Sequence, residues 1–148
     1  LICINACAGY KPIFSPTNLQ FEIADYSVEG EKKLGNKIYS KLYNLSKSNK
    51  NQEEITSVVI NIKVLKEKNS TSKDTTGKIL EYKINLNTKV IVKNYLTNDK
   101  LLDKNFISSS SYKVQDQYSE TIKLENKSLN DLINKTYQDL LIKLSENI

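Results

Sequence analysis

Four segments of the chain alternate apolar and polar residues with the period of two that is typical of a half-buried strand. The first runs from Leu19 to Val28 and changes phase after Ile23, which indicates a β-bulge. The others cover residues 58–64, 82–93 and roughly 101–112, and the four serines at 108–111 suit an edge strand. Residues 66–78 lack this periodicity and contain the turn-forming sequence Asp74-Thr75-Thr76-Gly77, so we expect a loop there.

Two other segments have helical spacing. Apolar residues recur at positions 34, 38, 42 and 45, while Lys33, Lys37 and Lys41 occupy another face. The last third of the chain is also amphipathic and, beginning near Tyr118, predicts a helix of about 30 residues and roughly 45 Å.

The resulting element order is βαβββα, with two one-sided helices and strands that each have one apolar face. This pattern predicts an α+β fold, a two-layer α/β sandwich in which two helices cover one face of a four-stranded, mainly antiparallel sheet. The chain has 148 residues, which suits one domain, and we assign that domain to residues 19–148.

The beginning of the chain resembles the end of a bacterial export signal. Ile4-Asn5-Ala6-Cys7 is similar to a lipobox, although Asn5 is an unusual member, and it predicts cleavage before Cys7 followed by acylation of that cysteine. Residues 1–6 would then be a residual signal peptide. Residues 7–18, which contain both prolines, would be a lipidated tether. The alternative is that Cys3 and Cys7 form a disulfide or metal pair, which would lack further Cys or His ligands.

The composition excludes several kinds of chemistry. The sequence contains no His, Met, Trp or Arg. This excludes acid–base catalysis and metal binding by histidine, and it excludes bidentate hydrogen bonds from arginine to phosphate. The serines at 108–111 lack a histidine base, and paired carboxylates do not stand out. We therefore expect no enzyme activity, no catalytic residues, no metal and no cofactor.

Positive charge is concentrated in the middle of the chain. Residues 61–113 contain eleven lysines and five acids, whereas the other residues contain eleven lysines and twelve acids. Alternation places a set of lysines on the polar face of the predicted sheet, about 7 Å apart where they are two residues apart on one strand. We expect this face to meet an anionic partner, and an ordinary solvated face is the alternative. The candidates are Lys63, Lys83, Lys89 and Lys93, together with the predicted loop residues Lys73 and Lys78.

RNA is a possible polyanion for a small basic sheet, but the aromatic residues do not fit it. RNA-binding sheets stack bases on exposed aromatic rings of the central strands, whereas Tyr82 falls on the predicted core side and Tyr95 at a strand end. We therefore expect no nucleic-acid partner.

Three segments resemble the lipopolysaccharide-assembly lipoprotein family, LptE, in its short alphaproteobacterial form. They are the opening Cys7–Phe14, the segment Asp74–Tyr82 before a long strand, and the end of the last helix at Leu140–Leu144. The opening departs from the family pattern in having Ala8 inserted after the cysteine.

This resemblance implies an α/β sandwich that is lipid-anchored on the periplasmic face of the outer membrane. It also implies a role as a plug in the LptD β-barrel, with lipopolysaccharide as ligand. The basic sheet face fits this role as our own site prediction. The alternative functions are an outer-membrane lipoprotein that is auxiliary to another transport system and, less favoured, a basic module that binds a polyanion or RNA through its sheet.

Overall fold

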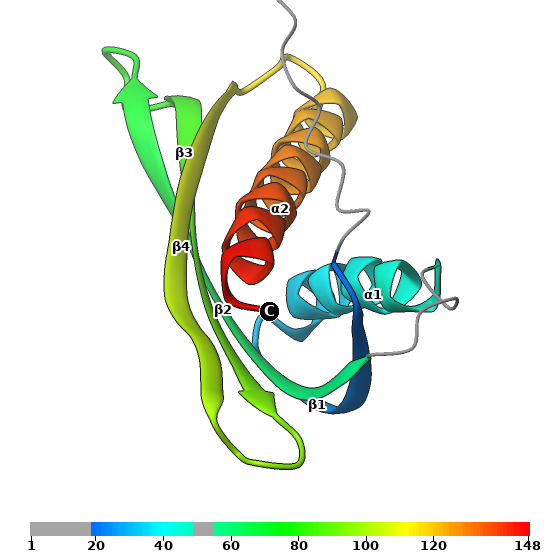
Figure 1. Cartoon of the computed structure of the whole chain (residues 1–148). Coiled ribbons are helices and arrows are strands. Elements are labelled where there is room, and N and C mark those ends of the chain that lie inside the picture. Colours follow the sequence, from blue (N-terminus) through cyan, green and yellow to red (C-terminus); the bar gives the residue numbers. More distant parts are fainter. Residues whose placement is uncertain (1–18, 49–54) are drawn as a thin grey trace, which may run out of the picture.

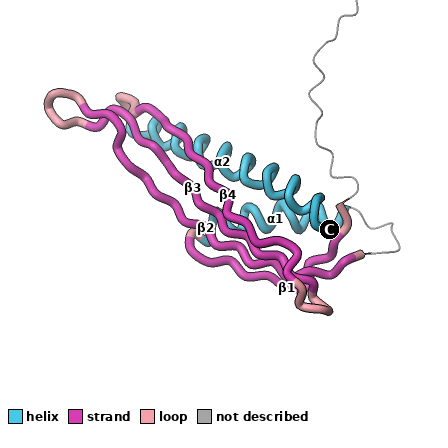
Figure 2. The backbone as a smooth tube through the Cα atoms, turned by 60° about the vertical axis from the view of Figure 1, so that its left-hand side comes forward, coloured by secondary structure: helices cyan, strands magenta, loops and turns pink. Residues whose placement is uncertain are grey.

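The computed structural model describes residues 19–48 and 55–148, which form one sheet and two helices. The strands are β1 (Phe21–Gly30), β2 (Thr56–Lys73), β3 (Ile79–Asn94) and β4 (Lys100–Lys113), and the helices are α1 (Lys32–Ser48) and α2 (Tyr118–Asn147). The sheet order is β1-β2-β3-β4, with β1 parallel to β2 and the other pairs antiparallel. Both helices lie on the same side of the sheet (Figure 1 and Figure 2). The predicted two-layer sandwich and its βαβββα order are confirmed.

The core lies between the sheet and the helices. Helix α1 covers β1 and β2, and α2 covers β4 and part of β3. The inward residues of β2 and β3 are almost completely buried, as are Ile38 and Leu42 of α1 and Leu140 and Leu144 of α2. Full burial of such a side chain contributes about 1.5–3 kcal/mol. The apolar layer therefore holds the helices in place, since in proteins most helical stability comes from the packing of an amphipathic face.

The connection from β1 to α1 explains why the first two strands are parallel. Gly30 ends β1 with a φ of 76°, and a Cβ atom there would collide with the carbonyl oxygen of Val64. The chain then enters α1, with the Glu31 amide donating to that same carbonyl at 2.8 Å. Because α1 carries the chain back along the sheet, β2 can start beside the start of β1. The predicted bulge in β1 is confirmed by a register shift between Ile23 and Asp25.

The prediction of a loop over residues 66–78 is wrong. Strand β2 continues to Lys73, and its residues from Lys66 onward pair with β3 from Leu86 to Ile79 through two register irregularities. This end of the hairpin extends beyond the helices (Figure 2), so most of its side chains are exposed and no apolar alternation is needed. Backbone pairing with β3 keeps the segment extended, and the turn shrinks to residues 74–78.

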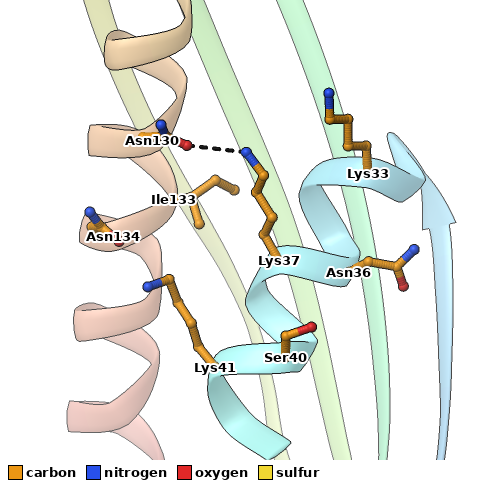
Figure 3. A pocket seen from close by; sticks show the side chains of 8 residues that line it. All are labelled: Lys33, Asn36, Lys37, Ser40, Lys41, Asn130, Ile133 and Asn134. Atoms are coloured by element: carbon orange, nitrogen blue, oxygen red, sulfur yellow. Dashed lines mark hydrogen bonds between the residues drawn. The ribbon is translucent and has the colours of Figure 1, made fainter. Parts of the chain in front are cut away.

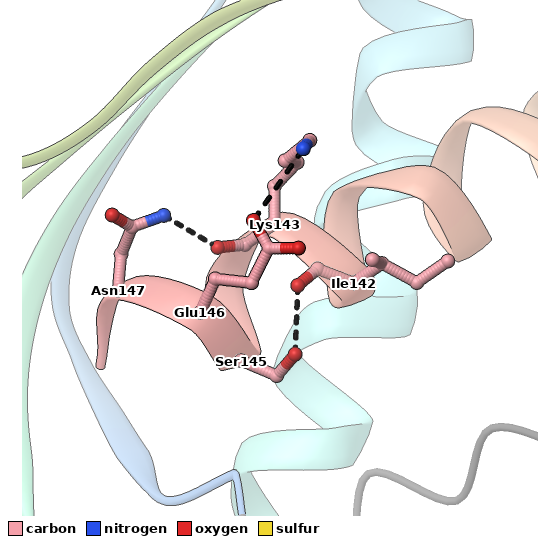
Figure 4. Close-up of polar contacts among 5 residues, drawn as sticks. All are labelled: Ile142, Lys143, Ser145, Glu146 and Asn147. Carbon is pink, nitrogen blue, oxygen red and sulfur yellow. Dashed lines mark hydrogen bonds and ion pairs between the residues drawn. The ribbon is translucent and has the colours of Figure 1, made fainter.

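Polar side chains near the end of α2 form hydrogen bonds with backbone carbonyls of the same helix (Figure 4). Ser145 Oγ donates to the carbonyl of Ile142, and Asn147 Nδ2 donates to the carbonyl of Lys143, both at 2.7 Å. Lys143 Nζ lies 3.4 Å from Glu146 Oε2. The amide of Ile148, the C-cap residue, donates to the carbonyl of Leu144 at 3.0 Å, so this cap and the side-chain bonds together close the end of the helix. Within residues 19–48 and 55–148, neither helix has a stretch long and apolar enough to cross a membrane.

Candidate functional site: two basic surfaces

The four predicted sheet lysines lie on the face that the helices leave uncovered. Lys63, Lys83 and Lys89 are exposed, and Lys93 is half-buried. Their neighbours along each strand, such as Ile62 and Val90, are buried under the helices. The alternation of side chains on β2 and β3 therefore places the lysines on the open face, opposite the core.

These lysines do not form one continuous stripe. Lys63 and Lys89 are direct partners across β2 and β3. Lys93 lies four residues along β3 from this pair, about 13 Å away, and Lys83 lies six residues the other way, about 20 Å away. Lys73 is the last residue of β2 and not part of a loop, whereas Lys78 lies in the turn beyond it.

Acids from the edge strands lie among these lysines. Strand β1 places Glu29 beside Lys63 in the parallel register, with Asp25 and Glu22 further along the same face. On the other side, β4 contributes Asp103, whose carboxyl accepts a hydrogen bond from Lys100 that holds its pKa below the usual value, with a smaller contribution from the charge of Lys89. The open face therefore has mixed charge, and the positive excess of residues 61–113 is partly offset by acids from outside that window.

A second basic surface lies in a groove of about 520 Å³ between α1 and α2 (Figure 3). Lys33, Lys37 and Lys41 line it from α1, and the amides of Asn130 and Asn134 line it from α2. Lys37 Nζ donates to Asn130 Oδ1 at 3.1 Å. Lysines at intervals of four on one helix face are visible in the sequence, but this spacing by itself predicts only a polar side of α1.

A cluster of polar and aromatic side chains links the sheet to α2 near the start of that helix. Lys68 Nζ lies 3.0 Å from Glu125 Oε2 and 4.4 Å from the ring centroid of Tyr82. The hydroxyl of Tyr112 donates to the same Glu125 oxygen at 3.1 Å. Burial lowers the pKa of Lys68, but hydrogen bonds with Tyr112 and Glu125 and their charges outweigh it, so this pKa is raised. Burial is the main cause that raises the pKa of Tyr112. No sequence pattern indicates this cluster, because its four members come from four separate elements, β2, β3, β4 and α2.

Comparison with solved structures identifies proteins with the same architecture. A minor lipoprotein of Acinetobacter baumannii matches with a TM-score of 0.60 and 11% identity over 87% of this chain and 92% of its own. A lipoprotein B of Nitrosomonas europaea matches with a TM-score of 0.59 and 17% identity, covering 90% and 88%.

The chain has the fold of these lipoproteins. Rare lipoprotein B of Shewanella oneidensis has it too, with a TM-score of 0.53 and 13% identity over 80% of this chain and 91% of its own. No family model matches the sequence, and no curated protein matches it at a significant level. The likeness is therefore one of three-dimensional structure, and it extends over most of each chain.

The predicted anchor at Cys7 and the predicted tether, residues 7–18, lie outside the described residues. Acylation of Cys7 and lipopolysaccharide binding by the sheet lysines both stay predictions.

Proposed function

We propose that the protein is a lipoprotein of the outer membrane that occupies an LptD-type β-barrel from the periplasmic side and supports the assembly of lipopolysaccharide. It acts by binding and not by catalysis. The observation that carries this proposal is the shared fold with lipoproteins from three bacteria, which covers at least four fifths of each chain. The lipobox-like sequence before Cys7 and the resemblance to the LptE family point the same way.

The open face of the sheet is the surface that we assign to the barrel. Its mixed charge suits contact with the polar interior of an outer-membrane barrel. Two large apolar side chains, Leu65 and Ile107, also lie on this face, and 51% and 73% of their surfaces are exposed. Leu65 of β2 and Ile107 of β4 pair with Asn87 of β3 from its two sides. Apolar residues grouped on a polar face favour a protein contact over plain solvent exposure.

Photo-crosslinking in living cells tests this assignment. A photoreactive phenylalanine analogue is placed at Ile107, and a matched control carries it at Tyr43, which is 41% exposed on α1. We expect the analogue at Ile107 to crosslink to a β-barrel protein of the outer membrane much more efficiently than the analogue at Tyr43. Equal crosslinking from both positions would refute the assignment of the open face. A crosslink from Ile107 to a component of a different transporter would favour the auxiliary role.

Binding of lipopolysaccharide to the sheet lysines is tested separately. We expect the purified full chain to bind lipopolysaccharide with an affinity that falls as salt is raised, because exposed charges are screened over about 8–10 Å. Replacing Lys83, Lys89 and Lys93 with Gln removes three of these charges, each worth roughly 1 kcal/mol near an anionic surface. The control carries Lys123→Gln, Lys127→Gln and Lys135→Gln on α2. If both triple variants bind like the unmodified chain, the sheet lysines are not the site.

A further inference from the structure

The groove between α1 and α2 offers hydrogen-bond donors and no negative charge. Besides the three lysines and two asparagines described above, it is lined by Asn36 and Ser40 of α1. Each of these polar side chains can donate a hydrogen bond, and three of them carry a full positive charge. In Figure 3 the side chains of Lys37 and Lys41 extend from α1 toward α2.

The lysine row is not neutralised by the rest of the described protein. Lys33, Lys37 and Lys41 are four residues apart, so adjacent members repel each other on the helix surface. Among residues 19–48 and 55–148, none of the three has a carboxylate within ion-pair distance; Lys37 bonds to the neutral oxygen of Asn130. Lys41 Nζ lies 5.6 Å from the ring centroid of Tyr137.

Two carboxylates line an adjoining hollow that shares lysines with the groove. Glu31 and Glu125 line that hollow together with Lys66, Lys33 and Lys37. Glu125 is already held by Lys68 and Tyr112, as described above. An anion entering the groove would therefore meet the row of ammonium groups without displacing an internal salt bridge.

We propose that this groove is a binding site for a phosphate-bearing anion. A phosphate group supplies several acceptor oxygens and up to two charges, which matches clustered ammonium, amide and hydroxyl donors. Successive lysines are about 6 Å apart along α1, so the row spans about 12 Å and suits a ligand with more than one phosphate. Either a free phosphate compound or the headgroup of a phosphorylated lipid has this chemistry. The inference is independent of the proposed role in a barrel.

Isothermal titration calorimetry of the purified full chain tests the site with two probes. One is inorganic pyrophosphate, and the other is a short-chain, water-soluble phosphatidate kept below its micelle concentration, with the matching phosphatidylcholine as blank. We expect saturable binding of at least one phosphate probe and none of the blank. Tighter binding of the phosphatidate would indicate a lipid headgroup, and equal or tighter binding of pyrophosphate would indicate a free phosphate compound.

The variant Lys37→Gln/Lys41→Gln locates the binding. Each lysine is expected to contribute roughly fivefold in affinity, so the double variant should bind about 25-fold more weakly. The control Lys123→Gln/Lys127→Gln removes the same charge from α2 outside the groove and should change the affinity less than twofold. No saturable binding of either probe, or an equal loss in the control, would overturn the proposal. Because no barrel is present, neither result bears on the barrel assignment.

Discussion

Gly35 sets how closely α1, and with it the lysine row, approaches the sheet. It lies between Lys33 and Lys37 in the sequence, on the buried side of α1. A Cβ atom at this position would collide with Cγ1 of Val28 on β1. The same atom would lie 3.5 Å from Cγ2 of Val64, in ordinary contact. Replacing Gly35 with Ala therefore adds one methyl group to a space that one valine already fills.

Two opposing effects decide the result of Gly35→Ala. Alanine is favoured over glycine inside a helix by about 0.8–1.0 kcal/mol. Overpacking a filled core costs about 1–3 kcal/mol, and Val28 cannot turn aside easily because its branched side chain is stiff at χ1. We expect the steric cost to win and the free energy of unfolding to fall by about 1 kcal/mol.

Urea unfolding followed by circular dichroism measures this change, and a double-mutant cycle with Val28→Ala identifies its cause. The Val28 variant removes the colliding methyl group, so Gly35→Ala should be stabilising in that background. The expected coupling between the two positions is about 1–2 kcal/mol. If Gly35→Ala raises the free energy of unfolding of the unmodified chain by its full helix propensity, or if the two changes are additive, the close contact does not limit the packing of α1.

Three further predictions concern other parts of the fold. Thr88 is fully buried, and its hydroxyl has no hydrogen-bond partner within residues 19–48 and 55–148, so Thr88→Val should raise the free energy of unfolding by about 1 kcal/mol in urea titrations, whereas Thr88→Ala should lower it. The pKa values of Lys68 and Tyr112 are raised in the folded chain, so their contribution to stability is complete below about pH 10 and is lost as pH rises through the folded values. Tyr112→Phe removes one of these groups and also a partner that raises the pKa of Lys68, so it should flatten that alkaline loss in thermal melts at graded pH, and an unchanged slope would contradict it. The Asp74 carboxyl accepts hydrogen bonds from the Thr76 hydroxyl and from backbone amides, which lower its pKa; the β2–β3 turn should therefore loosen below about pH 4, seen as faster amide exchange near the turn, and Asp74→Ala should remove this acid dependence.

The layers of the fold could be predicted from the sequence because they follow directly from apolar periodicity. Alternation in β2 and β3 and the spacing of three and four in the helices were sufficient to place both helices on one face. The second half of β2 could not be predicted in this way. Its residues 66–73 are polar on both faces, and what keeps them extended is pairing with β3, which is far away in the sequence until the hairpin closes.

The candidate sites were harder to predict, because charge on a surface depends on which strands become neighbours. Alternation placed Lys63 and Lys89 on the open face, but the parallel pairing of β1 brings Glu29 beside Lys63, and a count along the chain misses that acid. The groove depends likewise on α1 lying beside α2. The lysine row is visible in the sequence, whereas the facing amides of Asn130 and Asn134 are recognised as its neighbours only in three dimensions.

Affinity purification of the full chain from detergent-solubilised outer membranes, with its partners identified by mass spectrometry, tests the proposed function most directly. We expect one LptD-type β-barrel to be recovered in about equal amount, together with an amino-terminal peptide that begins at an acylated Cys7. Recovery of the chain from the soluble fraction with an uncleaved, unmodified amino terminus and no barrel would contradict both the proposed location and the proposed partner.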